Sequence, residues 1–250
     1  MRERILGTIL VVLYASFMVA SPKSFYVSLV YLLGVGMVSE LCEFTPFKDN
    51  KTAVTVIFSI LFFIGVHLKT FNFILPTVAV VFLFSYFVII EGKVPERFLG
   101  ITGFFVYLLI GIVAIAKLPK PYFLLLLSIV WSTDTFAYLV GKYFGKKKLI
   151  PEISPKKTVA GAIGGAIGGV ITSLIIGNHL GILEISFFYV FILFVLTFIS
   201  QIGDLIESYI KRVFDVKDSG HIIPGHGGVL DRLDSSIAVA PFLLALGGVS

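Results

Sequence analysis

Four aspartates lie in or beside apolar stretches of this chain, and their positions call for a chemical explanation. A charged side chain at the centre of a membrane-spanning helix costs about 2.5–3.5 kcal/mol on insertion scales. Asp134 and Asp204 lie inside two apolar stretches. Asp231 and Asp234 stand three residues apart, so they share a face if a helix leads into the last stretch. Magnesium usually takes one or two carboxylates together with substrate phosphates. Asp204, Asp231 and Asp234 therefore predict a site for phosphate-bound magnesium, with room for a second cation.

The segment 201–235 has the highest concentration of charge in the chain. It holds ten of the 35 acidic and basic residues, about twice what an even spread would give. Asp204, Ser208 and Lys211 follow one another at i, i+4 and i+7, so a helix turns an acid, a hydroxyl and a cation to one side. Proline and glycines surround His226 and indicate a tight turn whose backbone amides can approach a ligand closely.

Four basic residues are candidates for binding phosphate groups. Lys156 and Lys157 stand just before a glycine-rich apolar stretch, where a helix N-terminus would add partial positive charge. Lys211 and Arg212 add two cations beside the acidic residues of the charged segment. Together they predict a clamp for phosphate anions.

Three further features have simpler structural explanations. The run Lys146–Lys148 is explained by the excess of basic residues in cytoplasmic loops. Glu40 and Glu43 are expected to form a solvated or salt-bridged helix end. Glycines at four-residue spacing in the stretch 158–177 are typical of close helix packing, and we expect no strand before them to make a nucleotide-binding loop. These glycines are Gly161, Gly165 and Gly169.

The composition shows what kind of protein must position these residues. Of the 250 residues 57% are hydrophobic and 14% are charged, and the mean hydropathy is +1.01. Soluble domains have about 45–50% apolar and about 25% charged residues, so a soluble globule is excluded. The net charge of +5 reflects membrane orientation and lipid headgroups, and we expect no nucleic acid partner. A single cysteine, Cys42, excludes an internal disulfide and cysteine-cluster metal sites.

The apolar stretches predict an all-α, polytopic integral membrane protein with about nine transmembrane helices. A helix that crosses the hydrocarbon core needs about 20 residues. No small-x-small cleavage site precedes Ser21, so we expect the first stretch to be a span and not a signal peptide. The predicted spans are 5–20, 25–44, 52–68, 71–90, 98–116, 121–140, 158–177, 186–206 and 235–249.

The basic residues predict the orientation of these spans. With a cytoplasmic N-terminus, sixteen Lys and Arg residues fall on the inner side and four on the outer side. Two polar loops, 141–157 and 207–234, then face the cytosol. We expect residues 1–120 to form about five N-terminal spans, and residues 121–250 to form a catalytic region. Its active site would lie at the cytosolic face of the cytoplasmic membrane.

The motifs of the C-terminal half resemble those of the phosphatidate cytidylyltransferases, or CDP-diacylglycerol synthases. Two weaker matches are the run from Trp131 to Lys142, which contains Asp134, and SPKKT at 154–158. Val159 and Ala160 stand where many family members have an aromatic residue and Glu, so any role of that acid is not carried over. The strongest match comprises Ser208, Lys211, Arg212, Lys217, Asp218, Gly220, Pro224, His226, Gly227, Gly228, Asp231, Arg232 and Asp234.

The resemblance implies that CTP and phosphatidic acid react to give CDP-diacylglycerol and pyrophosphate, in phospholipid biosynthesis. It implies magnesium held by Asp204, Asp231 and Asp234. The implied catalytic residues are Asp204, Ser208, Lys211, Arg212, Asp231 and Asp234. The implied substrate-binding residues are Asp134, Lys156, Lys157, Lys217, Asp218, His226, Gly227, Gly228 and Arg232.

Two alternative functions stay open at this stage. A related enzyme could transfer the cytidylyl group to an isoprenoid or another lipid phosphate, because recognition of a lipid tail is diffuse apolar contact. A multi-span transporter would also place carboxylates in its spans, but it should show internal repeats and midplane charges, and neither is found. We expect CTP, phosphatidic acid and the bilayer as partners, and a homodimer is compatible with the sequence.

Overall fold

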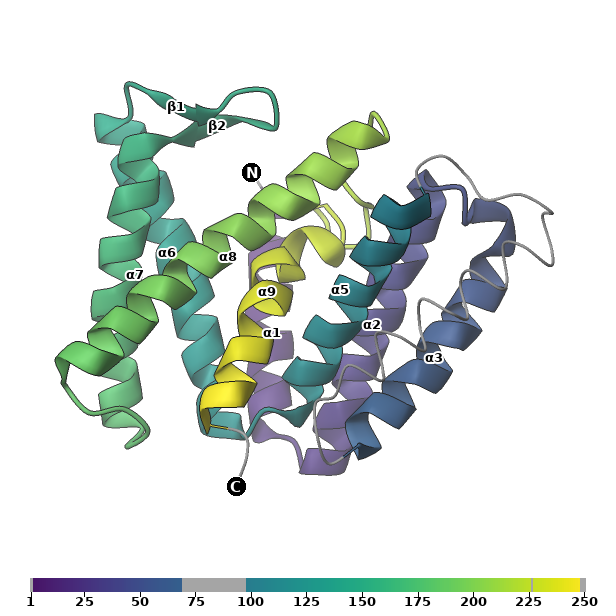
Figure 1. Cartoon of the computed structure of the whole chain (residues 1–250), viewed down its shortest axis with the longest axis horizontal. Helices are drawn as coiled ribbons and strands as arrows, with labels where there is room; N and C mark the ends of the chain where they lie inside the picture. The colour runs from purple at the N-terminus through teal and green to yellow at the C-terminus, as the bar shows by residue number, and fades with distance from the viewer. Residues whose placement is uncertain (1, 69–97, 226, 248–250) are drawn as a thin grey trace. The chain divides into compact units, whose positions relative to one another are not determined.

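The computed structural model describes residues 2–68, 98–225 and 227–247. This part of the chain is almost entirely helical (Figure 1). A short 3-10 turn, Lys48–Asn50, precedes α3. The helices are α1 (Arg2–Ala20), α2 (Lys23–Phe44), α3 (Lys51–His67), α5 (Phe98–Lys117), α6 (Lys120–Phe144), α7 (Val159–His179), α8 (Phe187–Val213) and α9 (Leu230–Gly247).

Six helical segments in the described residues are long and apolar enough to cross a membrane, so by length and composition the chain is a multi-pass membrane protein. They are Lys23–Phe44, Lys48–His67, Gly100–Lys117, Lys120–Phe144, Val159–His179 and Phe187–Val213. The predicted spans 5–20 and 235–249 correspond to α1 and α9, which are not among the six. The predicted span 71–90 lies outside the described residues. The count of nine spans therefore stays a prediction.

The chain divides into two compact units. The first comprises residues 1–117 and 219–230, and the second comprises residues 118–218 and 231–250. In the first unit, α2 packs against α3 and α5. The buried ring of Phe58 meets that of Phe105 edge-on at 6.3 Å between centroids. Gly34 makes room for this ring, because a Cβ there would lie 2.6 Å from Phe58 Cζ.

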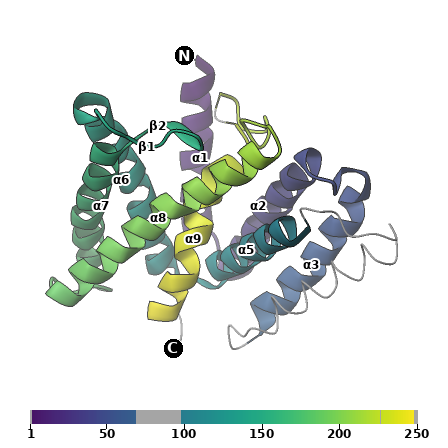
Figure 2. The same cartoon turned by 45° about the horizontal axis from the view of Figure 1, so that its top comes forward.

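In the second unit, α6 and α7 lie side by side, and α8 packs against both (Figures 1 and 2). The glycines of α7 allow this close approach. A Cβ at Gly161 would lie 2.7 Å from the carbonyl oxygen of Ala137, and one at Gly165 would lie 2.8 Å from that of Thr133. The prediction that these glycines serve helix packing is confirmed.

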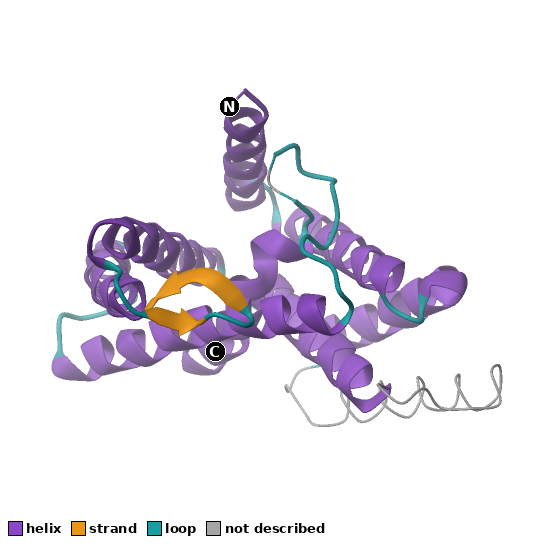
Figure 3. Cartoon of the chain, turned by 90° about the horizontal axis from the view of Figure 1, so that it is seen from above, coloured by secondary structure: helices purple, strands orange, loops and turns teal. Residues whose placement is uncertain are grey.

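A two-stranded antiparallel hairpin joins α6 to α7 and stands out in orange in Figure 3. Its strands are β1 (Lys148–Ile150) and β2 (Ser154–Thr158). The expectation that no strand precedes the glycine-rich helix is therefore wrong, and the predicted polar connection 141–157 contains this hairpin. The strand SPKKT has no alternating apolar pattern, and its pairing comes from the turn that sets Ile150 opposite Ser154.

The predicted polar connection 207–234 begins and ends in helices, and the helix expected to carry Asp204, Ser208 and Lys211 is confirmed. Helix α8 continues to Val213, and α9 begins at Leu230. Charged residues support the end of α8, because Glu207 and Lys211 form an ion pair of 2.6 Å at i, i+4 spacing. Asp215 follows with a positive φ of 57°, which ends the helical path.

Candidate active site

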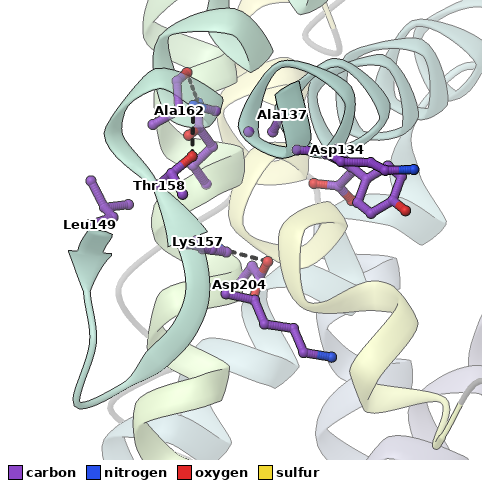
Figure 4. Close-up of a pocket in the computed structure, with 13 residues that line it drawn as sticks. Asp134, Ala137, Leu149, Lys157, Thr158, Ala162 and Asp204 are labelled. Atoms are coloured by element: carbon purple, nitrogen blue, oxygen red, sulfur yellow. Dashed lines mark hydrogen bonds and ion pairs between the residues drawn. The ribbon is translucent and has the colours of Figure 1, made fainter. Parts of the chain in front are cut away.

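A cavity of about 430 Å³ lies in the second unit, between α6, the hairpin, α7 and α8 (Figure 4). Four of the predicted site residues line it: Asp134 from α6, Lys156 and Lys157 from β2, and Asp204 from α8. Lys142 of α6 also lines it, so the cavity combines two acids and three ammonium groups from segments far apart in the sequence.

An ion pair spans this cavity. Lys157 Nζ lies 2.7 Å from Asp204 Oδ2, and both side chains remain about a quarter to a third exposed (Figure 4). Ser208 donates a hydrogen bond of 3.2 Å to the other oxygen of the same carboxylate. The predicted alignment of Asp204 and Ser208 on one helical face is confirmed.

Local packing explains why the lysine reaches the aspartate. Thr158, the last residue of β2, caps α7 by accepting a hydrogen bond of 3.1 Å from the amide of Gly161. Gln201 of α8 donates to the carbonyl oxygen of Ala162 at 3.2 Å. These contacts hold β2, α7 and α8 together next to Lys157.

A second charged cluster joins α8 to the start of α9. Lys211 Nζ lies 2.6 Å from Glu207 Oε2 and 2.5 Å from Asp231 Oδ1. The three side chains are 11%, 2% and 8% exposed, in the order Lys211, Glu207, Asp231. Glu207 Oε1 is buried without a hydrogen-bond partner in the described structure. Two buried carboxylates therefore share one ammonium group here, and Lys211 does not line the cavity.

Close contact between α8 and α9 places Asp234 near the cavity residues. A Cβ at Gly203 would lie 2.6 Å from the Cβ of Ala238 and 2.8 Å from the carbonyl oxygen of Asp234. Ser235 Oγ also donates to the carbonyl oxygen of Ser200 at 2.9 Å. Because Gly203 precedes Asp204, this packing brings the two aspartates together.

Asp234 is surrounded by both acidic and basic side chains. Asp134, Asp204 and Asp234 act on one another as like charges, Lys157 attracts both Asp134 and Asp234, and Arg232 attracts Asp134. In the part of the chain that the structure describes, no group of three or more His, Cys, Asp or Glu side chains is arranged to hold a metal ion alone. Neighbouring carboxylates with oxygen ligands fit a magnesium ion that takes its remaining ligands from substrate phosphates.

The first unit carries the remaining predicted motif, on the loop 219–230. Gly225 and Gly227 have positive φ angles of 69° and 84°. The amide of Ile223 donates to the carbonyl oxygen of Gly227 at 3.0 Å. The predicted tight turn is confirmed, whereas His226 itself lies outside the described residues.

Glu40 overturns the expectation of a solvated helix end. It is only 3% exposed, and its carboxylate accepts hydrogen bonds from residues of this loop. Glu43 behaves as expected, because it pairs with Lys51 at 2.5 Å on the surface. The sequence could not separate the two acids, since the donors to Glu40 come from about 180–190 residues further along the chain.

Similarity to known proteins decides the family. A model of the cytidylyltransferase family matches residues 2–249. The chain belongs to the cytidylyltransferase family. It is 33% identical over 273 residues to the phosphatidate cytidylyltransferase of Bacillus subtilis (strain 168), which covers 98% of this chain and 97% of that protein. It is 45% identical over 164 residues to the enzyme of that name from Rickettsia prowazekii (strain Madrid E), covering 56% of this chain and 69% of the relative.

Several predicted site residues of this cytidylyltransferase lie away from the cavity lining. Arg212 is exposed, and its guanidinium donates to the carbonyl oxygens of Ile153, at 3.4 Å, and Val216, at 3.0 Å. It thereby ties the hairpin turn to the end of α8. Lys217, Asp218 and Arg232 are also exposed.

Sequence reasoning missed some residues that belong to these arrangements. Glu207 stands four residues before Lys211, and that spacing could have identified it. Glu40 gave no such signal. Cavity residues outside the prediction also include Tyr138, Lys142, Thr158 and Gln201.

Proposed function

We propose that this membrane cytidylyltransferase transfers the cytidylyl group of CTP to phosphatidic acid, giving CDP-diacylglycerol and pyrophosphate for phospholipid biosynthesis. The whole-length similarity to a phosphatidate cytidylyltransferase supports the reaction. The single structural observation that carries the proposal is the cavity in which Lys157 meets Asp204, because it combines phosphate-binding and cation-binding groups.

The chemistry needs alignment and charge stabilisation more than covalent help from the protein. A phosphate oxygen of the lipid attacks the α-phosphorus of CTP, and the bond to the bridging oxygen of pyrophosphate breaks. Lys156 and Lys157 bind phosphate oxygens at the cavity, and Ser208 orients the carboxylate of Asp204. The other proposed contacts to substrate are Asp134, Lys211, Arg212, Lys217, Asp218, His226, Gly227, Gly228 and Arg232.

Asp204, Asp231 and Asp234 are the proposed magnesium ligands, together with substrate phosphates. The close packing of Gly203, next to Asp204, against the backbone of Asp234 supports these two. Asp231 would have to exchange its ion pair with Lys211 to join them. When bound, magnesium would neutralise negative charge on the phosphates and on the leaving pyrophosphate. A second cation is part of the same proposal.

We further propose nine spans, a cytoplasmic N-terminus and an active site at the cytosolic face of the cytoplasmic membrane. The sixteen-to-four division of basic residues supports this topology. In a Cys42→Ala background, Lys147→Cys and Asp215→Cys should react with an impermeant thiol reagent only from the cytosolic side, and Asn178→Cys only from outside. Labelling of positions 147 and 178 from one side would contradict the topology.

A homodimer is the remaining proposal about assembly. It would cover part of the apolar surface of α7, where Ile163, Ile167 and Ile171 are each more than half exposed. Cross-linking of cysteines at these positions in native membranes tests it. If the cysteines reacted completely with the cross-linker and the protein remained monomeric, the homodimer would be contradicted.

The decisive experiment supplies purified protein in nanodiscs with radiolabelled CTP, magnesium and one acceptor at a time. We expect pyrophosphate release and a cytidine-bearing lipid with phosphatidic acid. Diacylglycerol, which lacks the phosphate nucleophile, is the negative control, and an isoprenoid phosphate tests the alternative acceptor. Turnover only with the isoprenoid phosphate or with a non-lipid acceptor would overturn the proposed substrate.

A further inference from the structure

Glu40 is a buried carboxylate whose hydrogen bonds within the described residues lead to one loop. It lies near the end of α2, and it accepts hydrogen bonds from Ser219 Oγ at 2.9 Å and from the amides of Val229 and Leu230 at 2.8 and 2.9 Å. Burying a carboxylate is costly unless hydrogen bonds compensate for the lost water. The donors that compensate come from the first and the last two residues of the segment Ser219–Leu230.

The loop is shaped around this carboxylate. A Cβ at Gly220 would lie 2.8 Å from Glu40 Oε1, and one at Gly228 would lie 2.5 Å from Glu40 Cδ. Both distances are too short for a real side chain, so a substitution at either glycine must displace the carboxylate. Close packing at the two glycines and hydrogen bonding thus independently hold the carboxylate of Glu40 against the loop.

The same carboxylate also sets where α9 begins. Leu230 is the first residue of α9, and the amides at a helix start have no partner within the helix. Glu40 accepts hydrogen bonds from Leu230 and from the residue before it, and a negative charge at a helix N-terminus is favourable. Asp231 follows directly in the chain, so the position of this helix start matters for the catalytic residues.

We infer that Glu40 is a positioning residue that holds the loop Ser219–Leu230 in the conformation needed to bind substrate. The loop carries Gly227 and Gly228, which are proposed substrate contacts, and the buried carboxylate of Glu40 acts through this loop. Its expected effect on turnover rests on the proposed function, whereas its effect on the loop does not. Losing the carboxylate should therefore weaken CTP binding more than it slows the chemical step.

The first test measures hydrogen exchange of the full-length protein in nanodiscs, using overlapping peptides across residues 219–230. Glu40→Gln keeps the size of the side chain, but it removes the charge and turns one acceptor into a donor. We expect exchange at Val229 and Leu230 to become at least about tenfold faster, as the loss of hydrogen bonds to a charged group implies. Unchanged exchange would overturn the inference.

Glu43→Gln is the matched control. It lies three residues further along the same helix, and it is paired with Lys51 at the surface. It should leave exchange of the loop unchanged. Equal acceleration by both variants would show a general loosening of α2 and would overturn the specific role of Glu40.

The second test separates binding from chemistry. Glu40→Gln should raise KM for CTP about tenfold and change kcat by less than about threefold, because it removes binding interactions and leaves the reacting groups intact. Glu40→Asp, which keeps the charge, should recover part of the affinity, and Glu43→Gln should match the unmodified protein. A fall in kcat with unchanged KM, or no rescue by Asp, would overturn the positioning role.

Gly220→Ala provides a second variant if Glu40→Gln fails to fold. It leaves Glu40 in place but pushes against its carboxylate, so it should accelerate exchange at Val229 and Leu230 and raise KM for CTP. Normal exchange and normal KM in this variant would overturn the inference. Absence of CTP turnover in the unmodified protein would overturn the proposed function, and the exchange result would still decide whether Glu40 holds the loop.

Discussion

The cavity of the second unit and the loop of the first unit hold their carboxylates in different ways. In the cavity, Asp204 pairs with Lys157, a long side chain that remains partly exposed. At the loop, two backbone amides and the buried hydroxyl of Ser219 donate hydrogen bonds to Glu40 of α2. A lysine can turn from a carboxylate to a phosphate by rotating its side chain, whereas backbone amides cannot leave without unfolding the turn. The cavity is therefore built to exchange partners, and the loop is built to stay fixed.

The largest expected effect is a loss of turnover on substitution of a carboxylate at the cavity. Asp204→Asn nearly preserves size but removes a charge from the proposed magnesium site. We expect turnover to fall by at least about two orders of magnitude, as for loss of one strong electrostatic contact in a transition state. Folding and membrane insertion should be retained, and Asp231→Asn and Asp234→Asn should behave alike.

Asp215→Asn is the control for these variants. Asp215 lies beyond the end of α8 and is exposed, so activity should stay within about a few-fold of the unmodified protein. If Asp215→Asn lowered turnover as much as Asp231→Asn, the proposed set of magnesium ligands would be contradicted. Full recovery of all three site variants at about tenfold higher magnesium would contradict it as well, since the predicted loss lies in transition-state stabilisation.

Lys211→Met tests whether the second charged cluster is also structural. It leaves the carboxylates of Glu207 and Asp231 buried without their shared ammonium group. We expect the free energy of unfolding to fall by about 3 kcal/mol, measured by chemical denaturation in detergent. Glu207→Gln removes one of the two competing acids and should cost less than about 1 kcal/mol. The reverse order would show that Lys211 is not the group that stabilises the cluster.

Lys157→Met should affect substrate binding more than stability. The pair with Asp204 is partly exposed, so its loss should lower the free energy of unfolding by less than about 1 kcal/mol. The KM for CTP should rise by about tenfold or more, because one charged contact to phosphate is lost. Lys147→Met, on the exposed start of the hairpin, is the control and should leave KM within about twofold.

The smallest effects come from a pair of serines, one in each region. Ser208→Ala removes the hydrogen bond to Asp204 and should lower turnover by a few-fold, about what one hydrogen bond contributes, without changing exchange of the loop. Ser219→Ala removes the hydroxyl that donates to Glu40 and should accelerate exchange of the loop while kcat stays nearly constant. If both variants changed turnover and hydrogen exchange of the loop in the same way, the two regions would not differ in how they hold their carboxylates.

Much of the fold could be predicted because it depends on local composition. Long apolar stretches gave the described helices to within a few residues at most ends, and the glycine spacing of α7 predicted its close packing with α6. The hairpin was missed because Ser154 pairs with Ile150 through a turn that no apolar alternation announces. Hydropathy ended the eighth span at residue 206, whereas α8 continues to Val213, because the last turns of this helix carry charged side chains.

The site was predictable where its residues share one helix. Asp204 and Ser208 could be paired by counting along α8. Contacts to residues of other elements, such as the ion pair of Lys157 with Asp204, could be identified only from the three-dimensional structure. The same holds for Glu40, because the residues that donate hydrogen bonds to it come from near the opposite end of the sequence. Contacts between distant segments carry no signal in local spacing.

The place of the loop in the first unit has a consequence for biosynthesis. Glu40 leaves the ribosome 190 residues before Leu230, and at about 5–20 residues per second this separates them by roughly 10–40 s. During that interval the carboxylate lacks its final partners and must be kept hydrated or sheltered by the insertion machinery. The first unit can therefore reach its final packing only near the end of translation. A fragment that stops at Lys117 would be a membrane protein with an unfilled acceptor at the end of its second helix.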